Sequence, residues 1–152
     1  MEVYRIAQCR YIRDMSGAGA QLYGGRWNSK GLPVVYTGGN RSLCALEALV
    51  HIPQKNMTAD FCMAVIEIPE NCSVGMVAGK TLPKDWQSSL FPAALRQIGD
   101  SWCREGQYAV LQVPSALVPE EWNYLINPLH PDAGKITLKA VQPFMFDKRL
   151  LK

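Results

Sequence analysis

The sequence predicts an α+β protein, built as one compact domain on a mixed, mostly antiparallel sheet. Segments with strand character outnumber those with helical spacing, and the two kinds do not alternate strictly as they do in doubly wound folds. The chain of 152 residues has the length of one ordinary domain, and no repeat, low-complexity tract or linker divides it. We therefore expect a single domain over residues 1–152.

The first third of the chain predicts two strands, a loop and a helix. Residues 2–7 (EVYRIA) alternate between apolar and polar side chains, as a strand does. Residues 16–25 are small and Gly-rich, which predicts a loop whose backbone can approach another group closely. Residues 33–37 (PVVYT) are β-branched and aromatic, which predicts a buried strand. A helix should follow, with Asn40 or Ser42 as its N-cap.

The remaining two thirds predict three more strands and one more helix. Residues 62–69 (CMAVIEIP) have strand composition, and the apolar spacing over residues 88–103 is helical. Residues 108–113 (YAVLQV) form a strand that ends at a proline, and residues 114–131 are Pro-rich and expected to be irregular. Residues 135–141 (KITLKAV) alternate cleanly and predict the last strand.

Composition indicates a soluble enzyme or binding protein rather than a nucleic-acid or membrane protein. Hydrophobic residues make up 48% and charged residues 19%, as in ordinary globular domains. The net charge of +3 suits an anionic small molecule but is too weak for a nucleic-acid footprint. The polar N-terminal stretch is unlike a signal peptide, and no apolar run approaches the length of a membrane span. We expect a cytoplasmic protein that does not bind membranes.

The cysteines and histidines do not predict a metal site. The five cysteines form no CxxC pair, and we expect reduced thiols; they are Cys9, Cys44, Cys62, Cys72 and Cys103. The only histidines, His51 and His130, are not at metal-ligand spacing from each other or from a cysteine pair.

A carboxylate within an apolar helix is the first candidate site residue. Residues 43–53 (LCALEALVHIP) are apolar almost all the way round, which predicts a buried helix, yet Glu47 stands in its middle. Glu is rarely buried without a partner or a task, and His51 would lie one turn away. A catalytic carboxylate and a structural Glu47–His51 pair are both compatible with this pattern.

Three further polar residues stand in apolar or Gly-rich surroundings. Arg26 follows two glycines in YGGRWNSKG, so its guanidinium would project freely and bind a carboxylate or phosphate through two hydrogen bonds. Tyr36 ends a strand, where its ring could stack on a flat ligand. Ser115 follows a strand and a proline in VPSALVP. Each also has a structural explanation: a surface ion pair, core packing, and a turn or cap.

Taken together and in order, six stretches make the chain resemble the RES-domain toxins of bacterial toxin–antitoxin systems, a family named for a characteristic Arg, Glu and Ser. They are YRI at 4–6, SGAGA at 16–20, GGRWNSKGLPVVYT at 24–37, LEALVH at 46–51, VPSALVP at 113–119 and NYLINPLHP at 123–131. The match covers nearly the whole chain, whereas residues 57–108 carry no motif.

The resemblance implies a fold similar to that of ADP-ribosyltransferase toxins and an activity on NAD. The naming residues, expected to be catalytic, are Arg26, Glu47 and Ser115. The side chains expected to bind NAD are Arg5, Arg26, Tyr36, His51 and Asn127. The usual partner of the family is an antitoxin with an Xre-like helix-turn-helix part that plugs the active site. Contact with DNA would then be indirect, and a dimer within the complex is compatible with this expectation.

These residues suit cleavage of NAD at the nicotinamide–ribose bond. Glycosidases ordinarily use two carboxyl groups, but nicotinamide leaves from a cationic nitrogen and needs no general acid. Glu47 could stabilise the developing cation, Arg26 and Arg5 could hold the pyrophosphate, and Tyr36 could stack on the nicotinamide. Ser115 could bond either the carboxamide or Glu47. We expect a toxin that depletes cellular NAD and arrests growth, with NAD as substrate and no other cofactor or metal.

Three alternatives remain open at the level of the sequence. The first is a protein ADP-ribosyltransferase that uses NAD, since no motif identifies the acceptor as water, phosphate or a side chain. The second is a metal-independent ribonuclease, with Glu47, His51 and Arg26 as base, acid and phosphate clamp. The third is a non-catalytic binding module in which the Glu47–His51 pair is structural.

Overall fold

Seven strands form one sheet, in the order β4–β5–β6–β2–β1–β3–β7, in the computed structural model, which describes residues 1–152. Every neighbouring pair is antiparallel except β4 and β5, which are parallel. The strands are β1 (Glu2–Gln8), β2 (Val35–Gly38), β3 (Phe61–Glu67), β4 (Val74–Met76), β5 (Val110–Pro114), β6 (Trp122–Ile126) and β7 (Thr137–Phe144). The prediction of an α+β fold with a mixed, mostly antiparallel sheet is confirmed.

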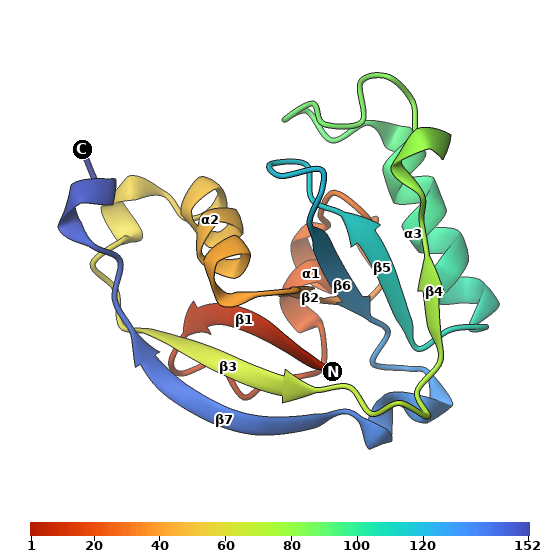
Figure 1. The fold of residues 1–152 in the computed structure, drawn as a ribbon, viewed down its shortest axis with the longest axis horizontal. Helices are drawn as coiled ribbons and strands as arrows, with labels where there is room; N and C mark the ends of the chain where they lie inside the picture. The colour runs from red at the N-terminus through yellow and green to blue at the C-terminus, as the bar shows by residue number, and fades with distance from the viewer.

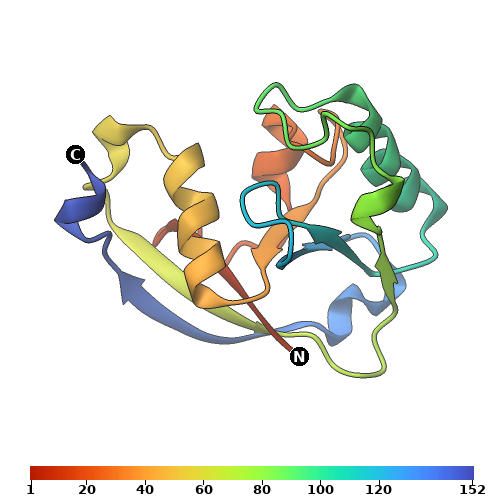
Figure 2. The same ribbon diagram turned by 45° about the horizontal axis from the view of Figure 1, so that its top comes forward.

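Helices cover the sheet unevenly. The α-helices are α1 (Ala18–Tyr23), α2 (Arg41–His51) and α3 (Ala93–Glu105), and the short 3₁₀ helices are η1 (Gln54–Asn56), η2 (Gly79–Thr81), η3 (Pro131–Lys135) and η4 (Lys148–Leu150). Figure 1 shows α2 above the half of the sheet that contains β1, β3 and β7, and α3 beside β4 and β5 at the other end. The turned view of Figure 2 shows the same arrangement. None of the helices has the length and apolar character that spanning a membrane would require.

The two halves of the sheet meet where β1 pairs with β2. Only Tyr4 and Gly38 are in register across this joint, whereas β1 and β3 pair along their whole length. Only two residues separate the end of β2 from the start of α2. The second of them, Asn40, caps the helix, since its side chain accepts a hydrogen bond from the N–H of Leu43 at 2.8 Å. The joint therefore places α2, and Glu47 with it, beside the strands of both halves.

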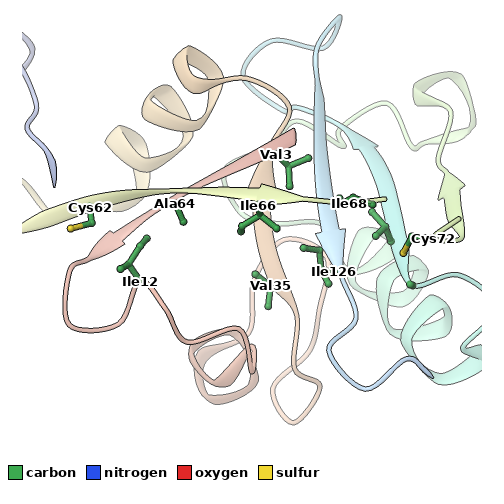
Figure 3. Packing of buried hydrophobic residues seen from close by; sticks show 11 residues of the cluster. Val3, Ile12, Val35, Cys62, Ala64, Ile66, Ile68, Cys72 and Ile126 are labelled. Atoms are coloured by element: carbon green, nitrogen blue, oxygen red, sulfur yellow. The ribbon is translucent and has the colours of Figure 1, made fainter. Parts of the chain in front are cut away.

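Alternate residues of the central strands point to opposite faces of the sheet and build two cores. Figure 3 shows Val35, Ala64, Ile66 and Ile126 gathered on one face, with Ile12 closing one end. The other face carries a cluster that packs against α3, whose buried members are Trp27, Val34, Leu95, Trp102, Leu111, Val113 and Leu125. The second cluster shares Trp27, Val34 and Leu125 with the lining of the cavity described below. The packing of α3 on this cluster therefore supports one side of the cavity.

Residues 16–25, expected to be a loop, contain α1. Gly17 precedes the helix in the left-handed conformation, with φ at 72°. The residues that follow include good helix formers, and the N–H of Gly24 closes the helix by bonding the carbonyl of Ala20 at 2.8 Å. The loop prediction was therefore wrong at its centre, because small residues were interpreted as flexible when several of them favour a helix.

Two predictions in the second half of the chain also need correction. The helix expected over residues 88–103 begins only at Ala93, because Pro92 precedes its first turn and Phe91 has a left-handed φ of 53°. The segment 114–131, expected to be irregular, contains β6, whose residues WNYLI pair with both β2 and β5. The prediction was wrong because the prolines on both sides of this short strand are typical of irregular segments.

The helix α2 is not buried all round, contrary to the prediction. Leu43 and Cys44 are buried, but Leu46 is 38% and Val50 is 56% exposed. Because α2 lies on top of the sheet with nothing packed over it, its outer apolar side faces solvent. Glu47 is consequently half-buried at the edge of the helix rather than enclosed within a core.

The expectation of five reduced thiols is also wrong, since Cys9 and Cys62 form a disulfide with their Cα atoms 4.9 Å apart. The antiparallel pairing of β1 with β3 brings the two positions together, which their spacing along the chain does not reveal. Cys44, Cys72 and Cys103 are free. Burial raises the pKa of the Cys44 thiol to about 12, so this thiol stays protonated at neutral pH.

Thiol titration checks the disulfide directly. In protein unfolded without reductant, three of the five cysteines should react, and all five should react after reduction. Reduction should also lower the free energy of unfolding by about 4 kcal/mol, because the bridge closes a loop with a sequence separation of 53 residues. The Cys9→Ser variant is the control and should show four thiols without reductant. Five reactive thiols in unreduced wild-type protein would contradict the bridge.

Candidate active site

A cavity of about 470 Å³ opens at the joint of the two halves of the sheet, within the usual size range of small-molecule sites. Residues of β1, α1, β2, α2 and β6 line it, together with the turn that contains Arg26 and the segment that precedes α3. The sequence-predicted residues on its wall are Arg5, Arg26, Tyr36, Glu47 and His51. Ser115 and Asn127 are not among the lining residues.

Two donors hold the carboxylate of Glu47 in one orientation. Its Oε1 accepts hydrogen bonds from Ser115 Oγ at 2.8 Å and from Asn123 Nδ2 at 2.7 Å. Its Oε2 accepts no hydrogen bond from the protein, and Glu47 is one of the residues that line the cavity. A half-buried carboxylate with one oxygen bound twice and the other free is arranged to accept a hydrogen bond from a ligand, or to stabilise positive charge on it.

Ser115 acts on Glu47 from behind the cavity. It is fully buried, and its Oγ also accepts hydrogen bonds from the N–H groups of Leu117 and Val118, both at 3.1 Å. These two bonds orient the hydroxyl so that its proton points to Glu47. Ser115 therefore has both of the roles considered from the sequence: it accepts bonds from the turn that follows it, and it bonds Glu47. Its position supports contact with the carboxylate rather than with a ligand.

Replacing Ser115 by alanine should reduce both stability and activity. Two partly buried N–H groups would lose their acceptor, which costs about 1 kcal/mol of unfolding free energy. The activity assigned to the site should fall by about tenfold, because Asn123 would hold Glu47 with one bond in place of two. Chemical denaturation and steady-state kinetics measure the two effects separately. Unchanged kcat in a destabilised but folded variant would contradict the role assigned to the Glu47 bond.

The asparagine that reaches the site is Asn123, not Asn127. Asn123 and Leu125 lie on the same side of β6 and both line the cavity. The Oδ1 of Asn123 is buried and has no hydrogen-bond partner, so its amide is committed to Glu47 alone. Asn127 follows the end of the strand, where its side chain bonds the carbonyl of Cys103 and the N–H of Leu129. The alternation in WNYLI was the sequence signal that could have selected Asn123.

Arg26 stands at a tight turn and is anchored at three points. Gly24, with φ at 73°, enters the turn in a conformation that glycine adopts readily. The Nη1 of Arg26 donates to the carbonyls of Trp86 at 2.9 Å and Ser88 at 3.0 Å, and its Cζ lies 4.7 Å from the centre of the Phe91 ring. Arg26 does not project into open space as predicted, but its Nε and Nη2 protons have no partner.

Arg5 is held in the same manner on β1. Its Nη1 donates to the carbonyls of Ile12 at 3.4 Å and Asp14 at 2.6 Å. Neither Arg5 nor Arg26 takes part in a salt bridge. Burial lowers the pKa of both guanidinium groups, a shift that Glu47 opposes at Arg26 and Asp14 opposes at Arg5. Two half-buried cations that form no salt bridge and line the same cavity favour a ligand with negative charge.

The hydroxyl of Tyr36 supports the turn of Arg26. It accepts a hydrogen bond from the N–H of Trp27 at 3.1 Å and donates one to Asn28 Oδ1 at 2.6 Å. Burial raises the pKa of Tyr36, which keeps the hydroxyl protonated and able to donate. Because the hydroxyl is occupied in this way, the part of Tyr36 available to a ligand is its ring.

The side chain of His51 does not pair with the carboxylate of Glu47. Its Nδ1 lies 2.7 Å from the main-chain oxygen of Glu47, as expected for positions one helical turn apart. Its ring is exposed and lies 6.2 Å from that of Phe91, centre to centre. The structural Glu47–His51 ion pair considered from the sequence is therefore absent.

Helix α3 secures the turn of Arg26 from outside the cavity. The buried carboxylate of Asp100 accepts hydrogen bonds from the N–H of Ser29 at 2.8 Å and its Oγ at 2.6 Å. At Gly99 the helix touches the main chain of Trp27, where a Cβ would meet the carbonyl oxygen at 1.6 Å. Gly99, Asp100 and Phe91 were not predicted to be part of the site, because no motif marks the segment in which they lie.

The side chains of the molecule offer no cluster of three or more His, Cys, Asp or Glu residues that could hold a metal ion. The acidic side chains that line the cavity are those of Asp14 and Glu47, and the basic ones are those of Arg5 and Arg26. These groups suit an anionic ligand at which positive charge develops during reaction.

The sequence matches a known protein family and several relatives over nearly its whole length. The RES domain family matches residues 2–147. Toxin Res of Photorhabdus laumondii is 39% identical over 155 residues, which cover 100% of this chain and 98% of the relative. Toxin Res of Yersinia enterocolitica is 40% identical over 153 residues, which cover 99% of each chain. The Prs ADP-ribosylating toxin of a Sphingobium species is 36% identical over 141 residues, which cover 91% of this chain and 88% of the relative.

A solved structure has the same fold. The toxin fold in the crystal structure of the M. tuberculosis MbcT–MbcA toxin–antitoxin complex matches with a TM-score of 0.79 at 18% sequence identity. The match covers 95% of this chain and 84% of the other. At that identity the likeness concerns the fold alone.

Proposed function

Since the chain belongs to the RES domain family of toxins, we propose that it is an enzyme that cleaves NAD at the nicotinamide–ribose bond. Loss of NAD would then arrest growth of the cell. Water or inorganic phosphate would accept the ADP-ribose, which makes the enzyme a glycohydrolase or a phosphorylase. The proposal goes beyond family membership, and it rests on the chemistry that the cavity residues can perform.

One observation carries the proposal: the cavity holds the oriented carboxylate of Glu47 together with two arginines that form no salt bridge. NAD combines a pyrophosphate with a ribose whose C1′ becomes cationic when nicotinamide leaves. The free donors of Arg26 and Arg5 suit the two negative charges of the pyrophosphate. The free Oε2 of Glu47 suits the ribose hydroxyls and the developing cation.

The bond changes require no metal and no general acid. The C1′–N bond breaks, and nicotinamide departs with the electron pair as a neutral molecule, because its ring nitrogen was cationic. The acceptor oxygen then bonds to C1′ and releases its proton to solvent or to Glu47. Preorganised electrostatic groups of this kind contribute several kcal/mol to lowering a barrier. The bonds from Ser115 and Asn123 keep Glu47 in place without reorganisation during the reaction.

Transfer of ADP-ribose to a protein is the second candidate function. The name of the Sphingobium relative, Prs ADP-ribosylating toxin, favours it, at 36% identity. The first half of the reaction would be the same, because nicotinamide leaves before or as the acceptor attacks. The two candidates differ only in which nucleophile reaches the far face of the ribose.

The ribonuclease alternative receives less support from the geometry. It required the side chains of Glu47 and His51 to act as a base and an acid on opposite sides of one phosphate. The Nδ1 of His51 is instead bonded to the main chain of its own helix, and the ring is exposed at the rim. We therefore retain it only as an outcome of the experiment below.

We also propose an antitoxin with an Xre-like helix-turn-helix part as the partner, which would connect the toxin to DNA only indirectly. The structural neighbour was solved as a toxin–antitoxin complex, and that supports a partner of this kind. A dimer within the complex is part of the same proposal. The cytoplasm, where NAD is abundant, is the proposed location. We propose no cofactor beyond the substrate NAD and the acceptor, water or phosphate.

The experiment mixes purified protein with NAD in buffers with and without phosphate, and separates the products by chromatography. Nicotinamide together with ADP-ribose identifies water as the acceptor, and phosphorylated ADP-ribose identifies phosphate. A cell extract added with labelled NAD detects transfer to protein. If folded protein releases no nicotinamide from NAD under any of these conditions, the proposal is rejected. Cleavage of added RNA would then favour a ribonuclease.

A further inference from the structure

Phe91 is the only residue other than glycine with a positive φ, at 53°. This conformation is costly for a side chain with a bulky aromatic ring, and such strain persists only where the surroundings maintain it. Here the carbonyl of Phe91 accepts a bond of 2.6 Å from Arg96, and its N–H bonds the carbonyl of Ser88 at 3.2 Å. Strained residues that are maintained in this manner concentrate at functional sites.

Core packing does not explain the strain. The ring of Phe91 belongs neither to the two cores on the faces of the sheet nor to the small third cluster of Met57, Phe61 and Phe146. It lines the cavity instead, with the guanidinium of Arg26 over its face at 4.7 Å from the ring centre. The neighbouring Leu90 is 89% exposed, so the segment is not held by general burial. The closest interaction that the conformation of Phe91 provides in the cavity is therefore the contact with Arg26, since the ring of His51 lies farther away, 6.2 Å between ring centres.

We propose that Phe91 is a positioning residue that orients Arg26 for binding a diphosphate, an inference that rests on the proposed function. The two Nη1 protons of Arg26 bond the carbonyls of Trp86 and Ser88, in the same segment as Phe91. Stacking on the ring fixes the plane of the guanidinium, and the Nε and Nη2 protons then keep one direction. These are the adjacent donors that bind two phosphate oxygens at once.

This arrangement predicts an effect on binding rather than on chemistry. The diphosphate keeps its charge throughout cleavage of the nicotinamide–ribose bond, so its contacts are alike in the bound substrate and in the transition state. Losing the orientation of Arg26 should therefore raise KM for NAD and leave kcat nearly unchanged. A residue needed only for folding would lower the amount of active enzyme without this separation.

The test compares Phe91→Leu with Phe91→Tyr. Both variants retain a Cβ at the strained position, so they differ in whether an aromatic ring lies beneath Arg26. Phe91→Leu should raise KM for NAD by about fivefold to tenfold, with kcat within about twofold of wild type, and Phe91→Tyr should restore KM. Leu90→Ala, next in the chain and exposed, is the matched control and should behave as wild type. Thermal unfolding of each variant establishes that it is folded.

A double-mutant cycle shows whether Phe91 acts through Arg26. In an Arg26→Ala background the additional change Phe91→Leu should have little further effect, because the group that it orients is gone. Calorimetry with ADP, which carries a diphosphate but no bond to cleave, should show the same pattern in affinity. Additive effects, or an unchanged KM and ADP affinity in Phe91→Leu, would overturn the role of Phe91 while wild-type enzyme still cleaves NAD. Wild-type protein that releases no nicotinamide would instead reject the function on which the inference rests.

Discussion

Glu47→Gln is expected to lower the rate of NAD cleavage by about a hundredfold to a thousandfold and to leave the fold intact. Glutamine has nearly the same shape, and its amide oxygen can still accept from Ser115 and Asn123. The substitution therefore removes the negative charge but preserves the packing around it. Nicotinamide release measures the rate, and growth of cells that express the variant without antitoxin gives an independent measurement.

Glu70→Gln is the matched control, because Glu70 is exposed and makes no hydrogen bond or salt bridge with another side chain. It changes the net charge by the same amount at a residue that does not line the cavity, and its activity should equal that of wild type. Glu47→Gln with a wild-type rate of nicotinamide release would rule out a catalytic role for this carboxylate. A variant that loses toxicity only in proportion to lost stability would point instead to a structural role.

Gly99→Ala is expected to destabilise the protein by about 1–3 kcal/mol, although alanine is the better helix former. A Cβ at Gly99 would lie 1.6 Å from the carbonyl oxygen of Trp27, and the obstacle is main chain rather than a flexible side chain. Either α3 or the turn of Arg26 must move, and the bonds between Asp100 and Ser29 would be stretched as a result. The free energy of unfolding, measured with denaturant, should fall together with the affinity for NAD.

Gly19→Ala provides the comparison, since Gly19 also lies in a helix but a Cβ there would meet nothing within 4 Å. It should leave stability unchanged or raise it by up to about 1 kcal/mol, through the intrinsic preference of alanine for helices. Equal stabilities for the two variants would mean that α3 is not held tightly against the turn. The support assigned to Gly99 and Asp100 would then have to be abandoned.

Elements with a clear local pattern were predictable from sequence. The alternation of EVYRIA and KITLKAV marked β1 and β7, and Asn40 marked the start of α2 through its capping side chain. Where two local signals competed, the prediction was wrong. Small residues predicted a loop where α1 lies, at residues 18–23. Prolines on both sides predicted an irregular segment where β6 lies, at residues 122–126. Several residues of α1 favour a helix, whereas β6 forms because it pairs with both β2 and β5.

The site was predictable in part. Motifs identified Arg26 and Glu47, and the structure brings both to one cavity. Asn123, Phe91 and Asp100 were not identified as parts of the site, because each acts on a residue far away in the chain. The bond from Asn123 to Glu47 spans 76 positions, and the one from Ser29 to Asp100 spans 71.

The sequence by itself determined most of the strand segments, the start of α2 and the three side chains that carry the family motif. Only the tertiary structure decided that Ser115 bonds Glu47 rather than facing the cavity, that Cys9 bridges to Cys62, and that Arg26 rests on Phe91. The physical reason is the range of the interactions. Periodicity and capping act over a few neighbouring residues, whereas the orientation of a carboxylate or a guanidinium depends on groups that meet only after the strands have paired and α3 has packed.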